Sequence, residues 1–553
     1  MEMTGAQILI ETLIEQGADT VFGYPGGAVL NIYDELYKNA DRIHHVIAAH
    51  EQGAAHAADG YARSTGKVGV VIATSGPGAT NLVTGIANAY LDSVPMVAIT
   101  GNVSCSLLGR DSFQEVDIVG VTYPITKHSY MVKDVTKLAD TVREAFAIAR
   151  SGRPGPVLID LPKDVQINST AFTPKSPAAP APSPVLREED LDQIAEMIKT
   201  AERPYIYCGG GVIIAEAGEL VAKLADTIDA PIGFSMMGLS AVPAAHPRSL
   251  GMVGMHGHYA STKAKSECDL LLALGVRFSD RATGDKSKYA SKARIIHIDV
   301  DSAEIDKNIP ATLGVNANVR EALEALLPRL TVQKHAKWEQ EIEDMRRYER
   351  EHTAGGIGTL TPYRVIDAIN AHADADTPIA TDVGQHQMWV AQHYDFRRPR
   401  TFISSGGLGT MGFGMGAAIG ACMATGKRTV LFTGDGSFGM NLNEMATAVS
   451  QNLPLVIMVM NNGVLGMVRQ WQTLFYEKRY SQTTLERKTD FVALAEAFGA
   501  TGLRAATPEE LDACVEKAFA IDGPVLIDCL INEDERVLPM IPPNSSVEHL
   551  IMK

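Results

Sequence analysis

Short runs of β-branched and apolar residues alternate along most of the chain with segments whose apolar residues recur at helical spacing. In the first third, the clearest runs cover residues 68–74 and 94–100. In the last third, runs at 429–433 and 455–460 flank a helical pattern at 441–449. This alternation predicts parallel sheets covered by helices on both faces, which is the α/β class.

Breaks in the alternation predict three consecutive α/β domains. We expect a first domain at 1–168, a proline-rich linker at 169–187, a second domain at 188–330, a charged and glycine-containing linker at 331–360, a third domain at 361–533 and an irregular tail at 534–553. The hexapeptide Gly-Pro-Val-Leu-Ile-Asp closes the first domain at 155–160 and recurs at 523–528 near the end of the third. This repeat indicates that the first and third domains share one fold, and that the second is a different α/β unit.

Polar clusters follow the two strands predicted in the third domain. Gly434-Asp435-Gly436 comes after the run at 429–433, as a tight turn, and Asn461-Asn462 comes after the run at 455–460. Ligands of open α/β sheets bind at the carboxyl ends of strands. One carboxylate, one amide and backbone oxygens suit Mg²⁺ holding a diphosphate better than zinc. Either cluster alone is typical of an ordinary turn, but their joint spacing favours a cofactor site.

Glu51 stands among small and apolar residues at a predicted helix start. Burial there favours the protonated form of a carboxyl group and lets it share a proton. The alternative is a helix-start acid that the helix dipole stabilises.

Composition excludes several classes of function. The formal net charge is −16, which provides no basic stripe for nucleic acid or anionic lipid. The six cysteines are scattered without the paired spacings of a zinc site or disulfide framework, as in proteins of a reducing cytosol. No apolar run is long enough to span a membrane. A helical pattern starts near Ile8 and leaves no room for a signal peptide, so we expect a cytoplasmic protein.

The Gly-Asp-Gly and Asn-Asn spacing resembles the signature of enzymes that use thiamine diphosphate (ThDP). Over nearly its whole length, the chain resembles the catalytic subunit of acetohydroxyacid synthase, also called acetolactate synthase. The matching segments are residues 22–28, 50–53, 112–115, 151–156, 162–164, 406–412 and 466–472.

The resemblance implies a transferase that decarboxylates pyruvate on ThDP and condenses the hydroxyethyl carbanion with a second 2-keto acid. Pyruvate then gives 2-acetolactate and 2-ketobutyrate gives 2-aceto-2-hydroxybutyrate, in the biosynthesis of valine, leucine and isoleucine. It also implies ThDP, Mg²⁺ and a non-redox FAD as cofactors, and a homodimer or homotetramer with its active site at the subunit interface. A small regulatory subunit is a further expected partner, whereas nucleic acid and membranes are not.

Individual roles follow from the same resemblance. Expected catalytic residues are Glu51, which would act on the aminopyrimidine ring, Met411, which would hold the cofactor bent, and Gln114 and Lys163. Expected substrate contacts are Phe113, Arg281 as a carboxylate clamp, Met467, Val468, and Trp471 as the wall beside the extra methyl of 2-ketobutyrate. Expected Mg²⁺ ligands are Asp435, Asn462 and the carbonyl of Val464. Expected ThDP contacts are Tyr24, Pro25, Gly26, Glu51, Pro77, Asn81, Val383, Gly384, Gln385, His386, Gly409, Met411, Gly434, Asp435, Gly436, Ser437, Asn462, Gly466 and Met467.

The second domain is expected to hold the FAD. The implied contacts are Arg153, Gly209, Gly210, Gly211, Met255, His256, Gly275, Arg277, Asp280, Arg281, Asp299 and Val300. These residues alone form no dinucleotide fingerprint. The chain also departs from the family at Asn316-Ala317-Asn318, where relatives usually carry a glycine-aspartate pair, and this leaves open how the adenosine end of FAD is held.

Three alternatives stay open at this point. A fermentative, FAD-independent acetolactate synthase should lack the Arg277–Arg281 stretch that this chain has. A pyruvate oxidase would use the flavin for electron transfer. A cofactor-binding partner without activity would have no reason to keep Glu51, Asp435 and Asn462 together.

Overall fold

Each of the three domains contains a six-stranded parallel sheet, in a computed structural model that describes residues 1–177, 182–353 and 355–553. The first sheet comprises β2 (Thr20–Tyr24), β3 (His44–Ile47), β4 (Gly69–Ala73), β5 (Met96–Asn102), β6 (His128–Met131) and β7 (Pro156–Pro162). The second comprises β9 (Pro204–Cys208), β10 (Ile232–Phe234), β11 (Ser249–Met252), β12 (Leu270–Leu274), β13 (Arg294–Asp299) and β14 (Leu313–Asn316). The third comprises β15 (Ile379–Thr381), β16 (Phe402–Ile403), β17 (Thr429–Gly434), β18 (Leu455–Asn461), β19 (Thr501–Ala505) and β20 (Val525–Leu530).

The first and third sheets have the same topology. Their strands run in the orders β3-β2-β4-β5-β7-β6 and β16-β15-β17-β18-β20-β19, which is one order when strands are numbered within each domain. The repeated hexapeptide enters the equivalent strands β7 and β20. The prediction that these domains share one fold is therefore confirmed.

The middle sheet has a different topology, as predicted. Its order, β11-β10-β9-β12-β13-β14, is that of the dinucleotide-binding doubly wound fold, with the strand order reversing between β9 and β12. In such sheets the crevice for a ligand opens at the carboxyl ends of the two strands that flank the reversal.

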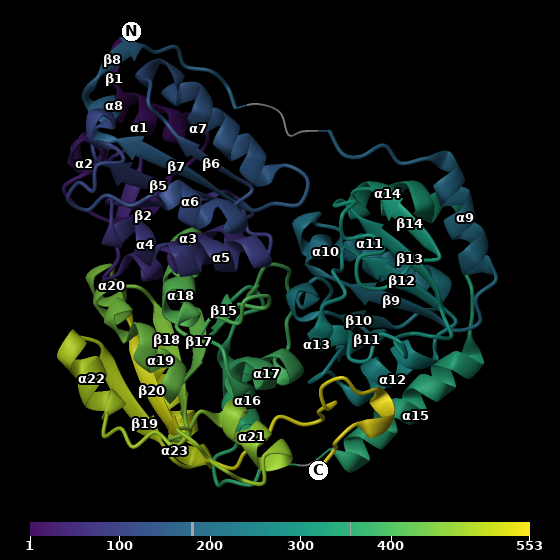
Figure 1. Cartoon of the computed structure of the whole chain (residues 1–553). Coiled ribbons are helices and arrows are strands. Elements are labelled where there is room, and N and C mark those ends of the chain that lie inside the picture. Colours follow the sequence, from purple (N-terminus) through teal and green to yellow (C-terminus); the bar gives the residue numbers. More distant parts are fainter. Residues whose placement is uncertain (178–181, 354) are drawn as a thin grey trace.

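Helices cover both faces of each sheet (Figure 1). Those of the first domain are α1 (Gly5–Glu15), α2 (Leu30–Lys38), α3 (Glu51–Thr65), α4 (Pro77–Asn81), α5 (Val83–Leu91), α6 (Ile118–Thr122), α7 (Val135–Arg150) and α8 (Lys163–Ile167). The middle domain and the connection after it carry α9 (Glu188–Lys199), α10 (Gly210–Ile214), α11 (Gly218–Ile228), α12 (Tyr259–Glu267), α13 (Asp280–Thr283), α14 (Val319–Leu326) and α15 (Ala336–His352). The third domain carries α16 (Pro362–His372), α17 (Gln385–His393), α18 (Phe413–Thr425), α19 (Asp435–Asn441), α20 (Met445–Ser450), α21 (Gly466–Phe475), α22 (Phe491–Phe498) and α23 (Pro508–Ala520).

Helices α3 and α18 join the first and third domains by an unusually close crossing (Figure 1). A Cβ added to Gly420 would lie 1.9 Å from the carbonyl oxygen of Ala57, and one added to Gly60 would lie 2.1 Å from that of Ala417. The backbones can approach this closely only because these positions carry no side chain. The crossing buries alanine-rich faces of both helices in one hydrophobic core.

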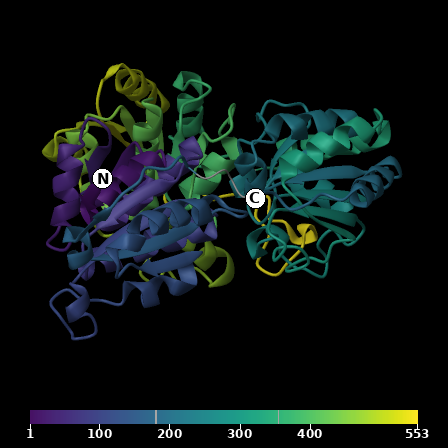
Figure 2. The same ribbon diagram turned by 90° about the horizontal axis from the view of Figure 1, so that it is seen from above.

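The middle domain lies beside the pair formed by the other two domains (Figure 2). Helix α15 returns along it, and the indole of Trp338 donates a hydrogen bond to the Pro204 carbonyl at 3.1 Å. The C-terminal tail then runs from the third domain to the middle domain, where the Ile541 N–H donates to the Met255 carbonyl at 2.8 Å. No helix in the described part of the chain is long and apolar enough to cross a membrane.

Two local predictions were wrong. The Gly-Asp-Gly cluster was expected as a turn, but Asp435 already begins α19, because the strand passes directly into a helix at the sheet edge. Residues 169–171 were assigned to the linker, but they form strand β8 (Ser169–Ala171), which pairs antiparallel with β1 (Glu2–Thr4). Positions 178–181 of that linker lie outside the described residues.

The close crossing predicts the effect of adding one methyl group. Gly420→Ala should force α3 and α18 apart and cost about 1–3 kcal/mol through overpacking. The measurement is the apparent Tm of the full chain. Gly27→Ala is the matched control, because a Cβ at Gly27 meets no atom within 4 Å. Equal Tm values for the two variants would contradict this account of the domain contact.

Candidate active site

The first part of the candidate site lies at the edge of the third sheet. Gly434 on β17 pairs with Met460 on β18, so Asp435 and Asn462 follow the ends of neighbouring strands. The Asn462 side-chain oxygen accepts a hydrogen bond from the Val464 N–H at 3.1 Å, which fixes the turn after β18. Burial raises the pKa of Asp435 to about 6. A buried carboxylate beside amide and carbonyl oxygens is a donor set that fits Mg²⁺.

Polar groups from the neighbouring β15–α17 turn complete this edge. The Ser437 hydroxyl donates to the Val383 carbonyl at 2.7 Å, and a Cβ on Gly434 would lie 3.1 Å from Nδ1 of His386. Burial lowers the pKa of His386 to about 3, and its Nε2 has no hydrogen-bond partner among the described residues. In the tautomer that carries its proton on Nε2, this neutral imidazole can donate a hydrogen bond to a phosphate oxygen beside Gly434.

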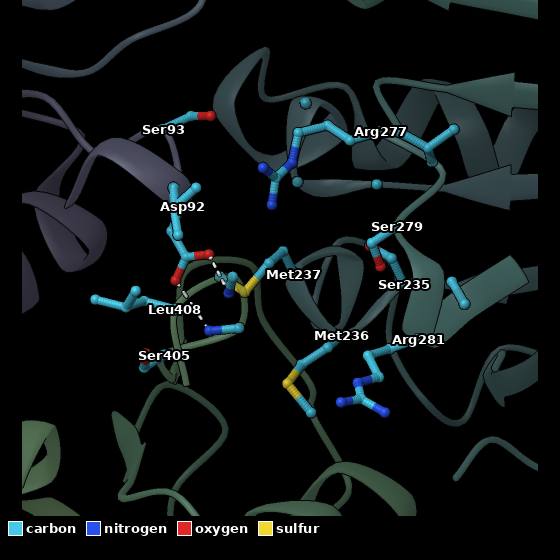
Figure 3. A pocket seen from close by; sticks show the side chains of 18 of the residues that line it. Asp92, Ser93, Ser235, Met236, Met237, Arg277, Ser279, Arg281, Ser405 and Leu408 are labelled. Atoms are coloured by element: carbon cyan, nitrogen blue, oxygen red, sulfur yellow. Dashed lines mark hydrogen bonds between the residues drawn. The ribbon is translucent and has the colours of Figure 1, made fainter. Parts of the chain in front are cut away.

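The loop at 406–412, which carries Gly409 and Met411, is held by the first domain of the same chain. Asp92 accepts hydrogen bonds from the Gly406 and Gly407 N–H groups at 2.9 and 2.7 Å (Figure 3). Arg63 donates to the same carboxylate at 2.9 Å. No sequence pattern indicated Asp92 or Arg63, because Asp92 holds a loop more than three hundred positions away and Arg63 acts on that loop through Asp92.

Two further residues that the sequence reasoning missed fix the same loop. The Asn88 side-chain oxygen accepts from the Ser405 hydroxyl at 2.6 Å. The Asp382 carboxylate accepts from the Gly412 N–H at 2.8 Å, where Gly412 has a left-handed φ of 88° before α18 starts. Burial raises the pKa of Asp382 to about 6, and backbone donors offset part of that effect.

Glu51 belongs to a second group of residues, at the edge of the first sheet. It is the first residue of α3, and its carboxylate accepts a hydrogen bond from the Asn81 side chain at 2.9 Å. A Cβ on Gly78 would lie 3.1 Å from the same carboxylate, and one on Gly76 would lie 2.9 Å from Cβ of Gln114. The structure therefore brings Glu51 and Asn81 together, with the Gln114 backbone beside Gly76. Glu51 is half-buried rather than fully enclosed.

A cavity of about 2080 Å³ lies where all three domains meet. The predicted site residues that line it are Arg153, Gly209, Gly210, Gly211, Met255, His256, Gly275, Arg277, Asp280, Arg281, Asp299, Val300, Val383, Gly384, Gly409, Met411, Met467, Val468 and Trp471. Within the described ranges, the remaining predicted residues do not line it. They are Tyr24, Pro25, Gly26, Glu51, Pro77, Asn81, Phe113, Gln114 and Lys163 of the first domain, and Gln385, His386, Gly434, Asp435, Gly436, Ser437, Asn462, Val464 and Gly466 of the third.

The middle-domain wall of this cavity follows the strand reversal between β9 and β12. A Cβ on Gly209 would lie 1.9 Å from the Gly275 carbonyl oxygen, so the two loops meet backbone to backbone. Arg277 points into the cavity (Figure 3), and burial and the neighbouring Arg153 lower the pKa of its guanidinium. None of the described residues accepts a hydrogen bond from that guanidinium. An unpaired, desolvated cation at the switch point of this fold fits the diphosphate of a dinucleotide such as FAD.

Other polar groups fit the remaining parts of such a ligand. Nδ1 of the buried His256 has no partner in the described part of the chain, and burial lowers the pKa of this imidazole to about 4. Asp299 ends β13, and burial raises its pKa to about 6. Asn316 donates to the Asp299 and Val300 carbonyls at 3.0 and 2.9 Å, and Asn318 caps α14. The two asparagines that depart from the family pattern thus stabilise this wall of the cavity through their own hydrogen bonds.

Four of the residues expected to contact the substrate line this cavity, and they come from two different domains. Arg281 starts from α13 of the middle domain, and its guanidinium lies 5.8 Å from the ring centre of Trp471 on α21 of the third domain. Met467 and Val468 precede Trp471 on α21 and line the same space. A guanidinium that can bind a carboxylate and an apolar wall therefore face the same cavity.

Comparisons with known proteins agree with this arrangement. Residues 3–121 match the thiamine pyrophosphate enzyme N-terminal binding domain, residues 191–326 the central domain and residues 382–529 the C-terminal binding domain. The acetolactate synthase isozyme 2 large subunit of Escherichia coli is 44% identical over 555 residues, covering 100% of both chains. The acetolactate synthase large subunit of Corynebacterium glutamicum is 45% identical, over 98% of this chain and 89% of its own. A probable acetolactate synthase large subunit of Methanocaldococcus jannaschii is 44% identical, over 99% and 95%. The chain therefore belongs to the acetolactate synthase large-subunit family of thiamine pyrophosphate enzymes.

Proposed function

We propose that the chain condenses two 2-keto acids with loss of CO₂, giving 2-acetolactate from pyruvate alone and 2-aceto-2-hydroxybutyrate from pyruvate plus 2-ketobutyrate. The observation that carries this proposal is the meeting of Met411, Arg281 and Trp471 in one cavity of a chain from the acetolactate synthase family. ThDP, when bound, accepts the electron pair that decarboxylation of a 2-keto acid leaves behind.

The protein residues would bind and orient this cofactor at its two ends. Asp435, Asn462 and the Val464 carbonyl would hold Mg²⁺ and the diphosphate, with His386 as an additional contact. Glu51, oriented by Asn81, would hold a proton at the ring nitrogen of the aminopyrimidine. Met411 would support the cofactor from the loop that Asp92 and Asp382 fix.

Two side chains would select the second substrate. Arg281 would pair with the 2-keto acid carboxylate through its planar guanidinium. Trp471 would enclose the apolar end, where 2-ketobutyrate has one methyl group more than pyruvate. Phe113, Gln114 and Lys163 would cover the opening of the substrate site on the side of the first domain.

The deciding experiment is an assay of the full chain with ThDP and Mg²⁺, with and without FAD, that quantifies both products. FAD-dependent formation of both acetohydroxyacids supports the proposal. Acetolactate formed equally well without FAD would favour the fermentative enzyme. Electron transfer from pyruvate to an acceptor dye would favour a pyruvate oxidase.

We further propose that the active site is completed by a second copy of the chain. Glu51 and its neighbours do not line the cavity that holds Met411 and Trp471, and the predicted substrate residue Phe113 is 87% exposed. Exposed large apolar side chains beside a half-formed site are typical of an interface. Because the relatives are large subunits, a small regulatory subunit is a further proposed partner.

Subunit complementation tests the shared site. Glu51→Gln should keep ThDP binding and lose about 10²–10⁴ in turnover, and Asp435→Ala should lose metal-dependent activity. A 1:1 mixture of the two variants after subunit exchange should recover about a quarter of wild-type activity, because half of the dimers are mixed and each has one intact site. Each variant exchanged with itself is the control. Mixed dimers without activity would indicate that Glu51 and Asp435 of the same chain act in one site, and would contradict the shared active site.

Trp471→Leu should change specificity more than rate. Pyruvate condensation should persist, while the preference for 2-ketobutyrate should fall by about 1–3 kcal/mol as the contact with the extra methyl is lost. Product ratios from mixed substrates measure this. Phe475→Leu is the matched control, since Phe475 packs edge-on against Trp471 but does not line the cavity. Wild-type product ratios for Trp471→Leu would contradict the proposed contact between Trp471 and the extra methyl group of 2-ketobutyrate.

Arg277→Met should weaken FAD binding about tenfold or more, because a charge-assisted contact with the diphosphate is lost. Quenching of flavin fluorescence on titration with the apoprotein measures the affinity without reference to activity. Arg187→Met is the control, because Arg187 is an exposed residue that pairs with Asp190 at the start of α9 and does not line the large cavity. Unchanged FAD affinity for Arg277→Met would argue against a dinucleotide at the β9–β12 reversal.

A further inference from the structure

A second, smaller cavity of about 110 Å³ lies behind the substrate side of the site, and we refer to it as the tail pocket. Its walls come from α12, α13, residues 284–290 and the segment 541–547 of the C-terminal tail. Figure 1 shows the tail against α12, and the Asp285 N–H donates to the Ser545 carbonyl at 3.1 Å. Met255 and Arg281 line both this pocket and the large cavity, so the two spaces share a wall.

Several polar side chains of the tail pocket have no protein partner in the described residues. They include the Thr283, Tyr289 and Ser546 hydroxyls, whose oxygens are buried without a hydrogen bond. Thr283 and Tyr289 are more than nine-tenths buried. Buried hydroxyl groups are rarely left unpaired, so three of them around one cavity indicate a missing partner.

Lys265 contributes a buried amine to the same pocket. It is 5% exposed, and its Nζ lies 3.9 Å from the ring centre of Tyr289. None of the described residues accepts a hydrogen bond or forms an ion pair with this amine. Buried lysines are almost always paired, so the absence of a carboxylate partner is unusual.

The charges around Lys265 favour a negatively charged ligand. Burial lowers the pKa of Lys265 to about 7, because no carboxylate stabilises its ammonium form, and burial raises the pKa of the adjacent Cys268 thiol to about 12, so the thiol is not the missing anion. A bound anion would stabilise the ammonium form. Asp280 is exposed, and Asp285 accepts hydrogen bonds from the Ser287 N–H and hydroxyl at 3.0 and 2.6 Å. Water alone would satisfy the hydroxyls but would leave the ammonium group without a counter-ion.

We propose that the tail pocket binds one small anion, an inorganic oxyanion or a short carboxylate, through Lys265, Thr283, Tyr289 and Ser546. The volume suits a small ligand, because it exceeds the roughly 10–15 Å³ that one water needs and is far below the 2080 Å³ of the large cavity. The ligand would also join the C-terminal tail to the middle domain, since Ser546 belongs to the tail and the other three groups do not.

The test uses the full chain saturated with ThDP, Mg²⁺ and FAD, so that their phosphate sites are filled. Inorganic sulfate and, in a second arm, acetate are titrated at constant ionic strength, with Tm and calorimetric binding as readouts. Lys265→Met removes the charge at similar length. Lys263→Met is the matched control, because Lys263 lies on the same helix and pairs with Glu267 at 3.0 Å.

The expected result is one sulfate or acetate site per chain that is unchanged in Lys263→Met and whose affinity is at least about tenfold lower in Lys265→Met, whereas anion binding at Arg281 is equal in all variants. Whichever anion binds more tightly identifies the class. Lys265→Met without anion should have a Tm no lower than wild type, because it removes an unpaired buried charge, and this excludes misfolding as the cause. Sulfate also stabilises proteins by exclusion from their surface, and that effect is equal in all variants. The proposal is overturned if neither anion binds the wild type, or if Lys265→Met binds them equally well.

Discussion

The contact between α3 and α18 is the constraint on which the rest of the molecule depends. Small residues on both helices let the backbones meet, and that contact fixes the first and third domains relative to each other. Around it, Glu444 of the third domain accepts hydrogen bonds from the Ala49 and His50 N–H groups at 3.1 and 3.0 Å, directly before Glu51. Burial raises the pKa of Glu444, and the two backbone donors and the Thr447 hydroxyl offset that effect. The start of α3 is thus positioned by the opposite domain.

The same domain pairing extends to the loop that carries Met411. Asp92, Asn88 and Arg63 form a buried network that reaches from the first domain to residues 405–410 of the third. Asp59 closes it by accepting from the Asn88 side chain at 3.0 Å. Both carboxylates, Asp59 and Asp92, are hydrogen-bonded and share the Arg63 guanidinium, which offsets part of the cost of burying them. The network therefore attaches the loop that carries Met411 to the first domain.

The middle domain adds a third wall with different chemistry. Its strand reversal presents glycine backbones and the unpaired Arg277 to the cavity, whereas the third domain presents methionine and tryptophan side chains. The tail returns to this domain, and Gln392 of α17 donates to the His256 carbonyl at 2.8 Å, so the wall is attached to the third domain at more than one place. The cavity is consequently a property of the assembled chain and of no single domain.

Local sequence patterns were enough to predict the strands, the repeated fold and the positions of the polar clusters. The runs at 429–433 and 455–460 became strands because their residues are β-branched or apolar over a strand's length, and that information is local. Asp435 and Asn462 could be placed together because they follow adjacent parallel strands. The helical start at Asp435 was mistaken for a turn, since glycine on both sides has the same local signature in either case.

Which residues share a cavity depends on contacts between distant parts of the chain, which local patterns do not encode. Ser405 bonds to Asn88 across 317 positions, and no periodicity encodes such a pairing. The burial of Lys265 could not be predicted from the sequence either, because a lysine at a helical position is ordinarily solvated. It is buried here because residues of α13 and of the C-terminal tail surround it beside α12. Local composition specifies elements, whereas burial and partner choice depend on what the rest of the chain brings to the same place.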